Sequence, residues 1–556
     1  MRTVNRLSRP LGAVGLGVAV AVSGLAVVPA AAQVYYVPVT DKVTLHGHGY
    51  GHGHGLSQYG AEGAARAGNG YREILRHYYP GTKLGRMRGK IRVLITADGT
   101  SDVKVSPTRG LSVRDRGTGR SWTLPVGDRV NRWRIVGNRV QFHKPAGWRR
   151  WNMPGPRRTL RGEGEFFAKN PIKLWVPSGG GEAARRYRGV LRAVNGNTVN
   201  VLRMDRYLRG VVPAEMPASW SLEALKSQAV AARTYATNER SRNRTRYYQT
   251  CDTTSCQVYG GVAYEHASTN RAVRQTARQI LRYNGEPAFT QFSASSGGWT
   301  SAGGYPYLPA KKDPWDKWSG NSVHRWSATV STDRLERRYD SLGRLRTIRV
   351  TKRDGNGHWN GRVLRMRLEG SRNDVTITGD DFRWIYGLRS NWFTIEPTPI
   401  VARWRRIGGA KSRVGRPTSS ERSAAHDGAV QRFERGRIFW HRRTGARETY
   451  GRILRAYLRM GGPKSSLRFP RTSVRRAGAD GTKVIFQRGR LYRNPPTGVH
   501  TLRNGWLRAY SRADFERGRL GMPLTDVHWH KGVRRMRFAG GNIVRQKDRD
   551  FVIRYR

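Results

Sequence analysis

The chain has 556 residues, with 103 Lys or Arg against 38 Asp or Glu, so its formal net charge is +65. This length is too great for one hydrophobic core and predicts roughly two to four domains. A hydrophobic fraction of 37% and 17 tryptophans exclude a disordered protein. The charge favours an anionic polymer as partner: nucleic acid, an anionic membrane or a cell-wall polymer.

The first 32 residues have the features of a secretory signal peptide. Residues 1–9 are basic, residues 11–28 form an apolar run, and three alanines at 30–32 provide a cleavage site. An uncleaved membrane anchor is the alternative, but the apolar run is short and ends in small residues. We therefore expect a protein that is secreted or held in the cell wall. This location argues against nucleic acid as the partner.

The middle of the chain alternates between strand-like and helical patterns. Short β-like runs fill residues 85–201, where Gly, Asn, Pro and Asp separate them. A long helix is predicted after Ser221, a suitable N-cap, because apolar residues recur at helical spacing over residues 222–236. A second helix is expected over residues 270–281, and strands and loops return after Phe289. The pattern predicts the α+β class.

The end of the chain repeats itself. Prolines recur 53 residues apart at Pro417, Pro470 and Pro523, and phenylalanines keep nearly the same step. Repeats of this length indicate stacked units that bury a shared core. They resemble LGFP repeats, a module of exported envelope proteins, which implies that residues 398–556 form about three units that bind the wall. A folded appendage without a ligand is the alternative.

Two segments resemble the SpoIID/LytB family of cell-wall proteins. One is YLRGVVPAEMP at residues 207–217 with the helix that follows it, and the other is GYGHGHGLSQYGA at residues 49–61. Further matches lie at residues 256–260 (CQVYG), 293–298 (SASSGG), 306–308 (PYL), 313–315 (DPW) and 387–393 (GLRSNWF). Sporulation members of this family are lytic transglycosylases of peptidoglycan, whereas LytB-type members modify an amidase.

The order of these segments departs from the family. The Gly-His-Gly segment usually follows the Leu-Arg-Ser-x-Trp-Phe element, but here it lies near the start of the chain, which resembles a circular permutation. We therefore expect residues 33–84 to return to the cleft of a β-rich catalytic domain with a few helices, formed by residues 85–397. Close ends of the domain would permit this return.

Glu215 matches the catalytic glutamate of the family by its motif. Pro213 and Pro217 flank it, and each is expected to hold the residue before it outside the helical region. An apolar setting would raise the pKa of the carboxyl, as a general acid needs. One carboxyl suffices for a lytic transglycosylase, because the 6-hydroxyl of N-acetylmuramic acid attacks its own anomeric carbon. A capping role for Glu215 is the alternative, and Glu223 competes as the acid.

The resemblance also implies a set of substrate-binding residues. It assigns this role to Lys226, Gln228, Arg233, Gln257, Ser293, Ser295, Ser296, His52, Ser57 and Gln58. A solvated helix face and a glycine-rich turn are the alternatives for the helical residues and the serines. The alternating histidines near the start also suggest metal binding.

The two cysteines, Cys251 and Cys256, predict a local disulfide in an exported protein. Zinc is the alternative, since some family members bind it here. His266 is the nearest histidine, however, and two thiolates with one distant imidazole make an incomplete site. We expect neither a metal nor a cofactor.

The leading hypothesis is an exported lytic transglycosylase that cleaves the MurNAc–GlcNAc bond and forms 1,6-anhydroMurNAc. Its expected partners are peptidoglycan glycan strands, anionic wall polymers that contact the repeats, and an amidase. The alternatives are a non-catalytic wall-binding protein that modifies or positions an amidase, and a polyanion-binding protein.

Overall fold

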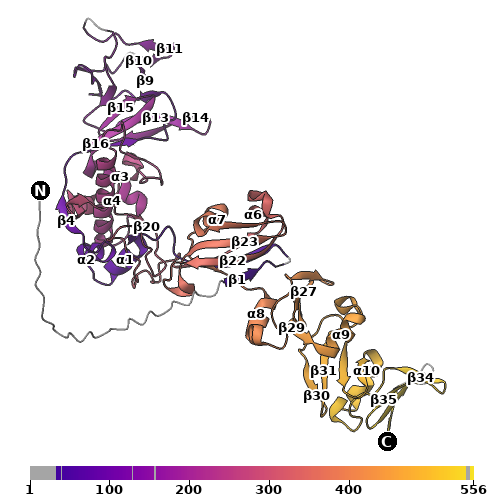
Figure 1. Cartoon of the computed structure of the whole chain (residues 1–556). Coiled ribbons are helices and arrows are strands. Elements are labelled where there is room, and N and C mark those ends of the chain that lie inside the picture. Colours follow the sequence, from indigo (N-terminus) through magenta and orange to yellow (C-terminus); the bar gives the residue numbers. More distant parts are fainter. Residues whose placement is uncertain (1–32, 39, 128, 156–157, 546–550) are drawn as a thin grey trace, which may run out of the picture.

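The computed structural model describes residues 33–545 and 551–556, except residues 39, 128, 156 and 157. The predicted signal peptide, residues 1–32, lies outside these residues. A β-rich region, a helical region, a middle sheet region and the C-terminal repeats follow one another in space (Figure 1). The predicted α+β class is confirmed. Among the described residues, no helix combines the length and apolar character needed to cross a membrane.

The β-rich region contains two sheets, which are antiparallel except where β17 pairs in parallel with β5. Several of their strands bury one face against the core. In β5, for example, Ile91 and Val93 are buried and Arg92 between them is half-buried, the alternation of a strand with one core face. The sheet orders are β17-β5-β16-β15-β12-β7-β8 and β11-β10-β9-β6-β13-β14. The strands are β5 (Lys90–Leu94), β6 (Asp102–Val105), β7 (Ser112–Asp115), β8 (Ser121–Thr123), β9 (Arg132–Val136), β10 (Arg139–Lys144), β11 (Gly147–Arg150), β12 (Gly164–Phe167), β13 (Ile172–Ser178), β14 (Gly181–Tyr187), β15 (Val190–Val194), β16 (Asn197–Arg203) and β17 (Thr250–Cys251).

The helical region is organised around α4, the long helix predicted after Ser221. Its alanines are buried and small, so neighbouring helices approach it from several sides, and α1, α2, α3 and α5 all contact it. Two short sheets, β19-β18-β4 and β20-β3, lie against these helices or continue from them. The elements are α1 (Gln58–Arg66), α2 (Tyr71–Tyr78), α3 (Met204–Glu215), α4 (Leu222–Arg242), η1 (Gly261–Tyr264), α5 (Ala267–Gln275), β3 (Leu56–Ser57), β4 (Lys83–Arg86), β18 (Gln279–Tyr283), β19 (Glu286–Pro287) and β20 (Phe292–Ser293).

The helix predicted over residues 270–281 is partly wrong. The structure has α5 at Ala267–Gln275 and then β18, which pairs with β4. Thr276 is the C-cap of α5, and Arg278 has φ of 66°, a left-handed conformation that turns the chain into β18. Ile280 and Leu281 therefore enter the core from a strand.

The prediction for Pro213 is also wrong. Pro213 lies inside α3, because burial of Val211 and Val212 outweighs the missing N–H. The expectation holds for the other proline, since Met216 before Pro217 is extended, with φ −128° and ψ 142°.

The middle region joins the two ends of the predicted catalytic part. The sheet order is β1-β22-β23-β24 in one sheet and β21-β2-β25 in the other. Strand β2, from the start of the chain, pairs with β25, so Leu45 lies opposite Ile395. The elements are β1 (Gln33–Tyr36), β2 (Lys42–His48), β21 (Arg325–Ser331), α6 (Asp333–Arg338), η2 (Asp340–Leu342), β22 (Leu345–Arg353), η3 (His358–Asn360), β23 (Val363–Gly370), β24 (Asp374–Thr378), α7 (Gly379–Tyr386) and β25 (Phe393–Ile395).

Each C-terminal repeat is a helix followed by four antiparallel strands. The proline and phenylalanine that recur in the sequence contact each other in every unit, as Pro417 does with Phe433. Helix α9 of one unit packs against Phe439 of the unit before it, so the cores are shared. The elements are α8 (Pro399–Arg406), η4 (Gly409–Lys411), β26 (Arg422–Ala424), β27 (Gly428–Phe433), β28 (Gly436–His441), β29 (Gly445–Tyr450), α9 (Gly451–Arg459), η5 (Gly462–Lys464), β30 (Arg475–Ala477), β31 (Gly481–Phe486), β32 (Gly489–Asn494), β33 (Gly498–Leu502), α10 (Asn504–Arg512), η6 (Phe515–Arg517), β34 (His528–His530), β35 (Val533–Phe538), β36 (Gly541–Arg545) and β37 (Phe551–Tyr555).

Candidate functional site

Glu215 is the last residue of α3, where the chain turns toward α4. The buried side chains of Leu208, Val211 and Val212 fix the helix against the core, so the position of its end is well defined. The Glu215 side chain is half-buried, and its Oε1 accepts a hydrogen bond from the backbone N–H of Val258 at 3.2 Å. The carboxyl thus lies at the margin of the core, partly open to solvent.

Burial raises the pKa of the Glu215 carboxyl above its ordinary value. Hydrogen bonds from Val258 and from the Gln58 side chain oppose the rise but do not cancel it. Tyr207 and Tyr235 lie nearby, and the pKa of each is raised mainly by burial, with the Glu215 charge as a further cause. A carboxyl that retains its proton at higher pH is suited to general acid chemistry.

The N-terminal segment reaches this carboxyl. Gln58 is the first residue of α1, and Ser57 caps that helix by accepting a hydrogen bond from Gly60 N at 3.1 Å. Gln58 is buried, and the geometry leaves its Nε2 without a well-formed hydrogen bond within the described residues. The segment predicted to return to the Glu215 cleft therefore lies beside it, with an amide group next to the carboxyl.

Glu62 fastens α1 to the start of α4. It is fully buried and accepts hydrogen bonds from the N–H of Ser221 at 2.8 Å and from its hydroxyl at 3.2 Å. Arg66 pairs with the same carboxylate at 2.7 Å. Ser221 occupies the predicted N-cap position but makes no side-chain cap, because its hydroxyl is bound to Glu62.

Asp316 is the hub of the loops that face α1. It is fully buried, and it accepts hydrogen bonds from the hydroxyls of Ser57 at 2.8 Å and Ser295 at 2.9 Å. The N–H groups of Ser296 and Gly297 add two more, each at 3.1 Å. Asn321 Nδ2 lies at 3.2 Å and His324 Nδ1 at 2.7 Å from the same carboxylate. The hydroxyls of Ser57 and Ser295, two of the predicted sugar-binding serines, therefore donate to a buried carboxyl group.

Asp313 is a second buried carboxyl beside this hub. Ser296 Oγ donates to it at 2.7 Å and Tyr78 OH at 3.0 Å. Burial, together with the nearby charge of Asp316, raises the pKa of Asp313 to about 7. These contacts give Ser296 a scaffold role and tie α2 to the loop that follows β20.

Ser293 contacts the backbone next to His52. Ser293 Oγ accepts a hydrogen bond from Gly53 N at 3.2 Å. His52 stacks on His54 with ring centroids 4.8 Å apart. Burial, with the charges of His54 and Arg362 as further causes, lowers the pKa of His52 to about 3. His52 is therefore a neutral imidazole at physiological pH.

Arg233 and Gln257 have structural roles. Arg233 is fully buried; its guanidinium pairs with Asp205 at 3.0 Å and donates to backbone carbonyls of α5 and β18. Gln257 is also buried and bonds at both ends, accepting from Tyr207 OH and donating to Ala232 O. Their bonds leave no clear way to reach a ligand, so the geometry replaces the predicted substrate contacts with packing contacts.

Lys226 and Gln228 point to different environments although they share α4. Lys226 pairs with Glu223 at 2.6 Å, and Glu223 also accepts a hydrogen bond from Tyr71 N at 2.9 Å. Glu223, the competing acid, is thus fixed at the start of α2, and its pKa is lowered because these hydrogen bonds outweigh its burial. Gln228 is fully buried, and neither end of its amide has a partner among the described residues.

Cys251 and Cys256 form a disulfide, with Cα atoms 5.5 Å apart. Within the described residues, no group of three or more His, Cys, Asp or Glu side chains is arranged to hold a metal ion.

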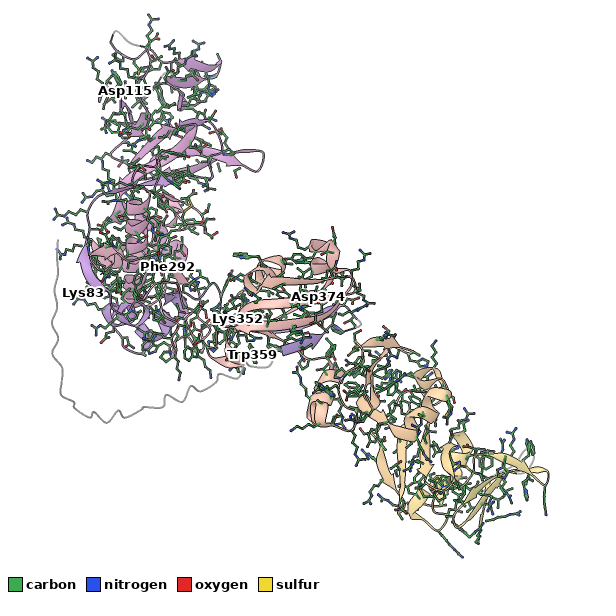
Figure 2. All side chains as sticks on the ribbon, in the orientation of Figure 1. Lys83, Asp115, Phe292, Lys352, Trp359 and Asp374 are labelled. Atoms are coloured by element: carbon green, nitrogen blue, oxygen red, sulfur yellow. A yellow bond between two sulfur atoms is a disulfide. The ribbon has the colours of Figure 1, made fainter. Side chains whose placement is uncertain are left out.

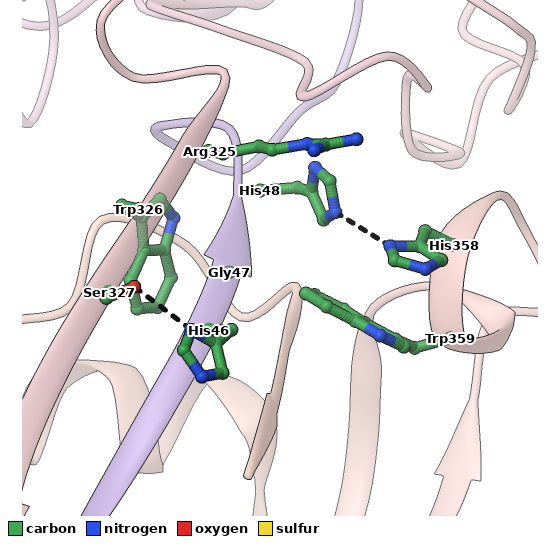
Figure 3. A pocket seen from close by; sticks show the side chains of 8 residues that line it. All are labelled: His46, Gly47, His48, Arg325, Trp326, Ser327, His358 and Trp359. Atoms are coloured by element: carbon green, nitrogen blue, oxygen red, sulfur yellow. Dashed lines mark hydrogen bonds between the residues drawn. The ribbon is translucent and has the colours of Figure 1, made fainter. Parts of the chain in front are cut away.

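The other two N-terminal histidines, His46 and His48, line a pocket of about 460 Å³ to which His52 does not contribute. Figure 3 shows His46 and His48 of β2 facing His358 and Trp359, with Arg325 above them. His48 Nε2 lies 3.2 Å from His358 Nδ1. Burial and the neighbouring histidines lower the pKa of His48 to about 4. The run of alternating histidines is therefore divided between two surroundings.

Sequence reasoning missed Asp316 and the hub role of Asp313, although DPW had been matched as a motif. The sequence does contain a signal for this pair of acids. Asp316 directly follows the motif, and Asp313 and Asp316 stand three positions apart in a loop rich in tryptophan. The two carboxyl groups accept hydrogen bonds from residue 57 and from residues 295–324. These segments are far apart in the sequence, so the sequence alone does not show that they meet.

Comparison with known proteins identifies two modules. The family model for stage II sporulation protein SpoIID matches residues 193–283, and that for the LGFP repeat matches residues 414–465. The resemblance to the SpoIID/LytB family and to LGFP repeats is confirmed. The SpoIID match includes Glu215, whereas residues 49–61 lie outside it.

Three curated relatives show the same pattern. The amidase enhancer of Bacillus subtilis (strain 168) is 44% identical over 135 residues, which cover 23% of this chain and 17% of the relative. Stage II sporulation protein D of the same organism is 30% identical over 223 residues, 35% of this chain and 64% of the relative. Its counterpart in Bacillus amyloliquefaciens is 30% identical over 244 residues, 40% of this chain and 65% of the relative. The chain spans less than two thirds of each relative.

Proposed function

We propose that this protein is a lytic transglycosylase that cleaves the MurNAc–GlcNAc bond of peptidoglycan, with Glu215 as its single acid and base. The observation that carries the proposal is a half-buried carboxyl whose pKa is raised by burial, at the end of a packed helix and beside an amide from a distant segment. The similarity to stage II sporulation protein D supports a task in the cell wall.

In the proposed reaction, protonated Glu215 gives its proton to the glycosidic oxygen, and the bond from that oxygen to the anomeric carbon of MurNAc breaks. The carboxylate then takes the proton from the 6-hydroxyl of the same sugar. The 6-oxygen bonds to the anomeric carbon, which gives a 1,6-anhydro ring. No water is consumed, so no second carboxylate is needed, unlike in a typical glycoside hydrolase.

The surroundings of Glu215 fit this scheme. Burial and two hydrogen bonds account for its pKa, without a contribution from a charged neighbour among the described residues. Glu223, the nearest rival in sequence, is occupied by Lys226 and by the start of α2. Gln58 is buried, and its amide lies next to Glu215, where it can position the carboxyl.

A second function has support of its own. The relative named amidase enhancer is 44% identical over 135 residues, which favours a non-catalytic protein that positions or stimulates an amidase. In that case Glu215 would hold the loop at Val258 and would not transfer a proton. Export to the cell wall and contact between the C-terminal repeats and wall polymers belong to both functions.

The deciding experiment compares the wild type with Glu215→Gln on purified glycan strands. Glutamine retains an oxygen for the Val258 hydrogen bond but cannot donate a carboxyl proton. We expect 1,6-anhydro ends with the wild type, and a loss of about 100-fold or more in the variant. Ordinary reducing ends would indicate hydrolysis instead. No cleavage by the wild type, with amidase stimulation unchanged in the variant, would establish the second function.

A further inference from the structure

A cavity between the first two C-terminal repeats is surrounded by arginines. Its volume is about 510 Å³. Helix α9, strands β30 and β32, and the loop before β26 all contribute to it. The six arginines that line it are Arg413, Arg452, Arg455, Arg475, Arg476 and Arg493.

This cavity has no negative charge of its own. No Asp or Glu lines it, and within the described residues none of the six guanidinium groups forms an ion pair or donates a hydrogen bond to the protein. Three acids of the repeats have other partners: Glu448 pairs with Arg403, Glu434 with Arg435, and Glu516 with Lys483. Six like charges around one space repel one another, so the folded repeats gain stability when an anion enters.

The repeat itself does not require these arginines. Helices α9 and α10 begin 53 residues apart, and β30 and β34 keep the same offset. At four of the six positions the next repeat has a different residue: Ser466 for Arg413, Gly505 for Arg452, His528 for Arg475 and Trp529 for Arg476. Since both units adopt the same fold, the arginines serve something other than packing.

The side chains are also accessible. Arg413, Arg452, Arg455, Arg475 and Arg476 are exposed, and Arg493 is half-buried. Figure 2 shows long nitrogen-tipped side chains projecting from the repeat units. The guanidinium fork binds phosphate and carboxylate oxygens in pairs. Several forks around one open cavity match a chain that carries an anion at each unit.

We infer that this arginine cavity binds an anionic glycopolymer of the cell wall through phosphate or carboxylate groups along its chain. The inference rests on the proposed wall function, but its site is separate from Glu215. The cavity would hold the protein on one wall polymer while Glu215 acts on another.

The test uses the full mature chain and a triple variant, Arg452→Gln, Arg475→Gln and Arg476→Gln. The matched control removes the same charge at exposed arginines that do not line the cavity: Arg442→Gln, Arg459→Gln and Arg508→Gln. Arg508 is the counterpart of Arg455 in the next repeat. The probes are poly(glycerol phosphate) and polygalacturonate, which separate phosphate from carboxylate, and binding is measured at two salt concentrations.

We expect the triple variant to bind one of the two polymers at least tenfold more weakly and to show a shallower salt dependence, because fewer counterions are released. The control should stay within about twofold of the wild type. Equal losses in both variants would overturn the inference in favour of non-specific attraction by the +65 charge. Failure of the wild type to bind either polymer would overturn it as well.

Cleavage of glycan strands free of anionic polymer separates this inference from the proposed function. The triple variant should release as much 1,6-anhydro product as the wild type, and Glu215→Gln should bind the polymer normally. If the wild type binds polymer but releases no anhydro product, the enzymatic proposal fails and the arginine cavity stands.

Discussion

Glu215 and Asp316 are two acids of one region that the fold treats in opposite ways. Asp316 is fully buried and accepts hydrogen bonds from Ser57, Ser295, Ser296, Gly297, Asn321 and His324. Glu215 is half-buried and has two hydrogen-bond neighbours, Val258 and Gln58. A buried carboxyl group that accepts many hydrogen bonds holds the surrounding loops together. A partly buried carboxyl group with few donors has its pKa raised by burial, which suits it to proton transfer.

The largest effect on stability is expected at Asp316. Asp316→Ala would leave several buried donors without a partner, so we expect unfolding to become easier by about 3–5 kcal/mol. Denaturant titration followed by circular dichroism measures this loss. Asp340→Ala, at an exposed acid, serves as the control. A change of less than about 1 kcal/mol for Asp316→Ala would contradict the hub role.

At Asp313 we expect the stability of the fold to depend on pH. Its pKa is raised to about 7 by burial and by Asp316, so deprotonation disfavours the folded state. This contribution to stability is complete below the ordinary carboxyl pKa and is lost as pH rises through about 7. Asp313→Asn should remove that decline, by an amount on the order of 1–3 kcal/mol between pH 5 and 8. If the Tm of the wild type and that of Asp313→Asn changed equally with pH across this range, the prediction would be wrong.

Glu215 should behave in the same direction but more weakly, because it is only half-buried. Its pKa is raised by burial, so Glu215→Gln removes a charge that disfavours the folded state at neutral pH. We expect the Tm to rise by about 1–3 °C at pH 8 and to remain unchanged near pH 4, where both side chains are neutral. A lower Tm at pH 8 would show instead that the ionised Glu215 side chain stabilises the fold.

The smallest effect is expected at Gln58. Its amide lies next to the Glu215 carboxyl and lowers the pKa of that group, so Gln58→Leu should raise that pKa further. The alkaline limb of the pH–rate profile should then move to higher pH, because activity falls as Glu215 loses its proton, while the maximal rate changes less than about tenfold. Tyr59→Phe, at the neighbouring residue, provides a control. An unmoved limb would mean that Gln58 does not position the carboxyl.

Local sequence patterns located candidate site residues but not their partners. Motif reading placed Glu215 just ahead of the long helix after Ser221 and assigned Gln58 to the segment expected to return to the same cleft, and the structure brings the two side chains close together. Ser57, Ser295 and Ser296 were predicted as sugar contacts, but the hydroxyls of Ser57 and Ser295 donate to Asp316 and that of Ser296 donates to Asp313. Ser57 and Asp316 are 259 positions apart in the chain, and no local pattern reveals such a contact.

The sequence by itself determined the α+β class, the long helix after Ser221 and the period of the repeats, because hydrophobic spacing and turn residues act over short distances. Only the tertiary structure decided that β2 pairs with β25, that Pro213 stays within a helix, and that six arginines face one cavity. Each depends on burial and charge summed over segments far apart in the chain, and these energies outweigh local preference.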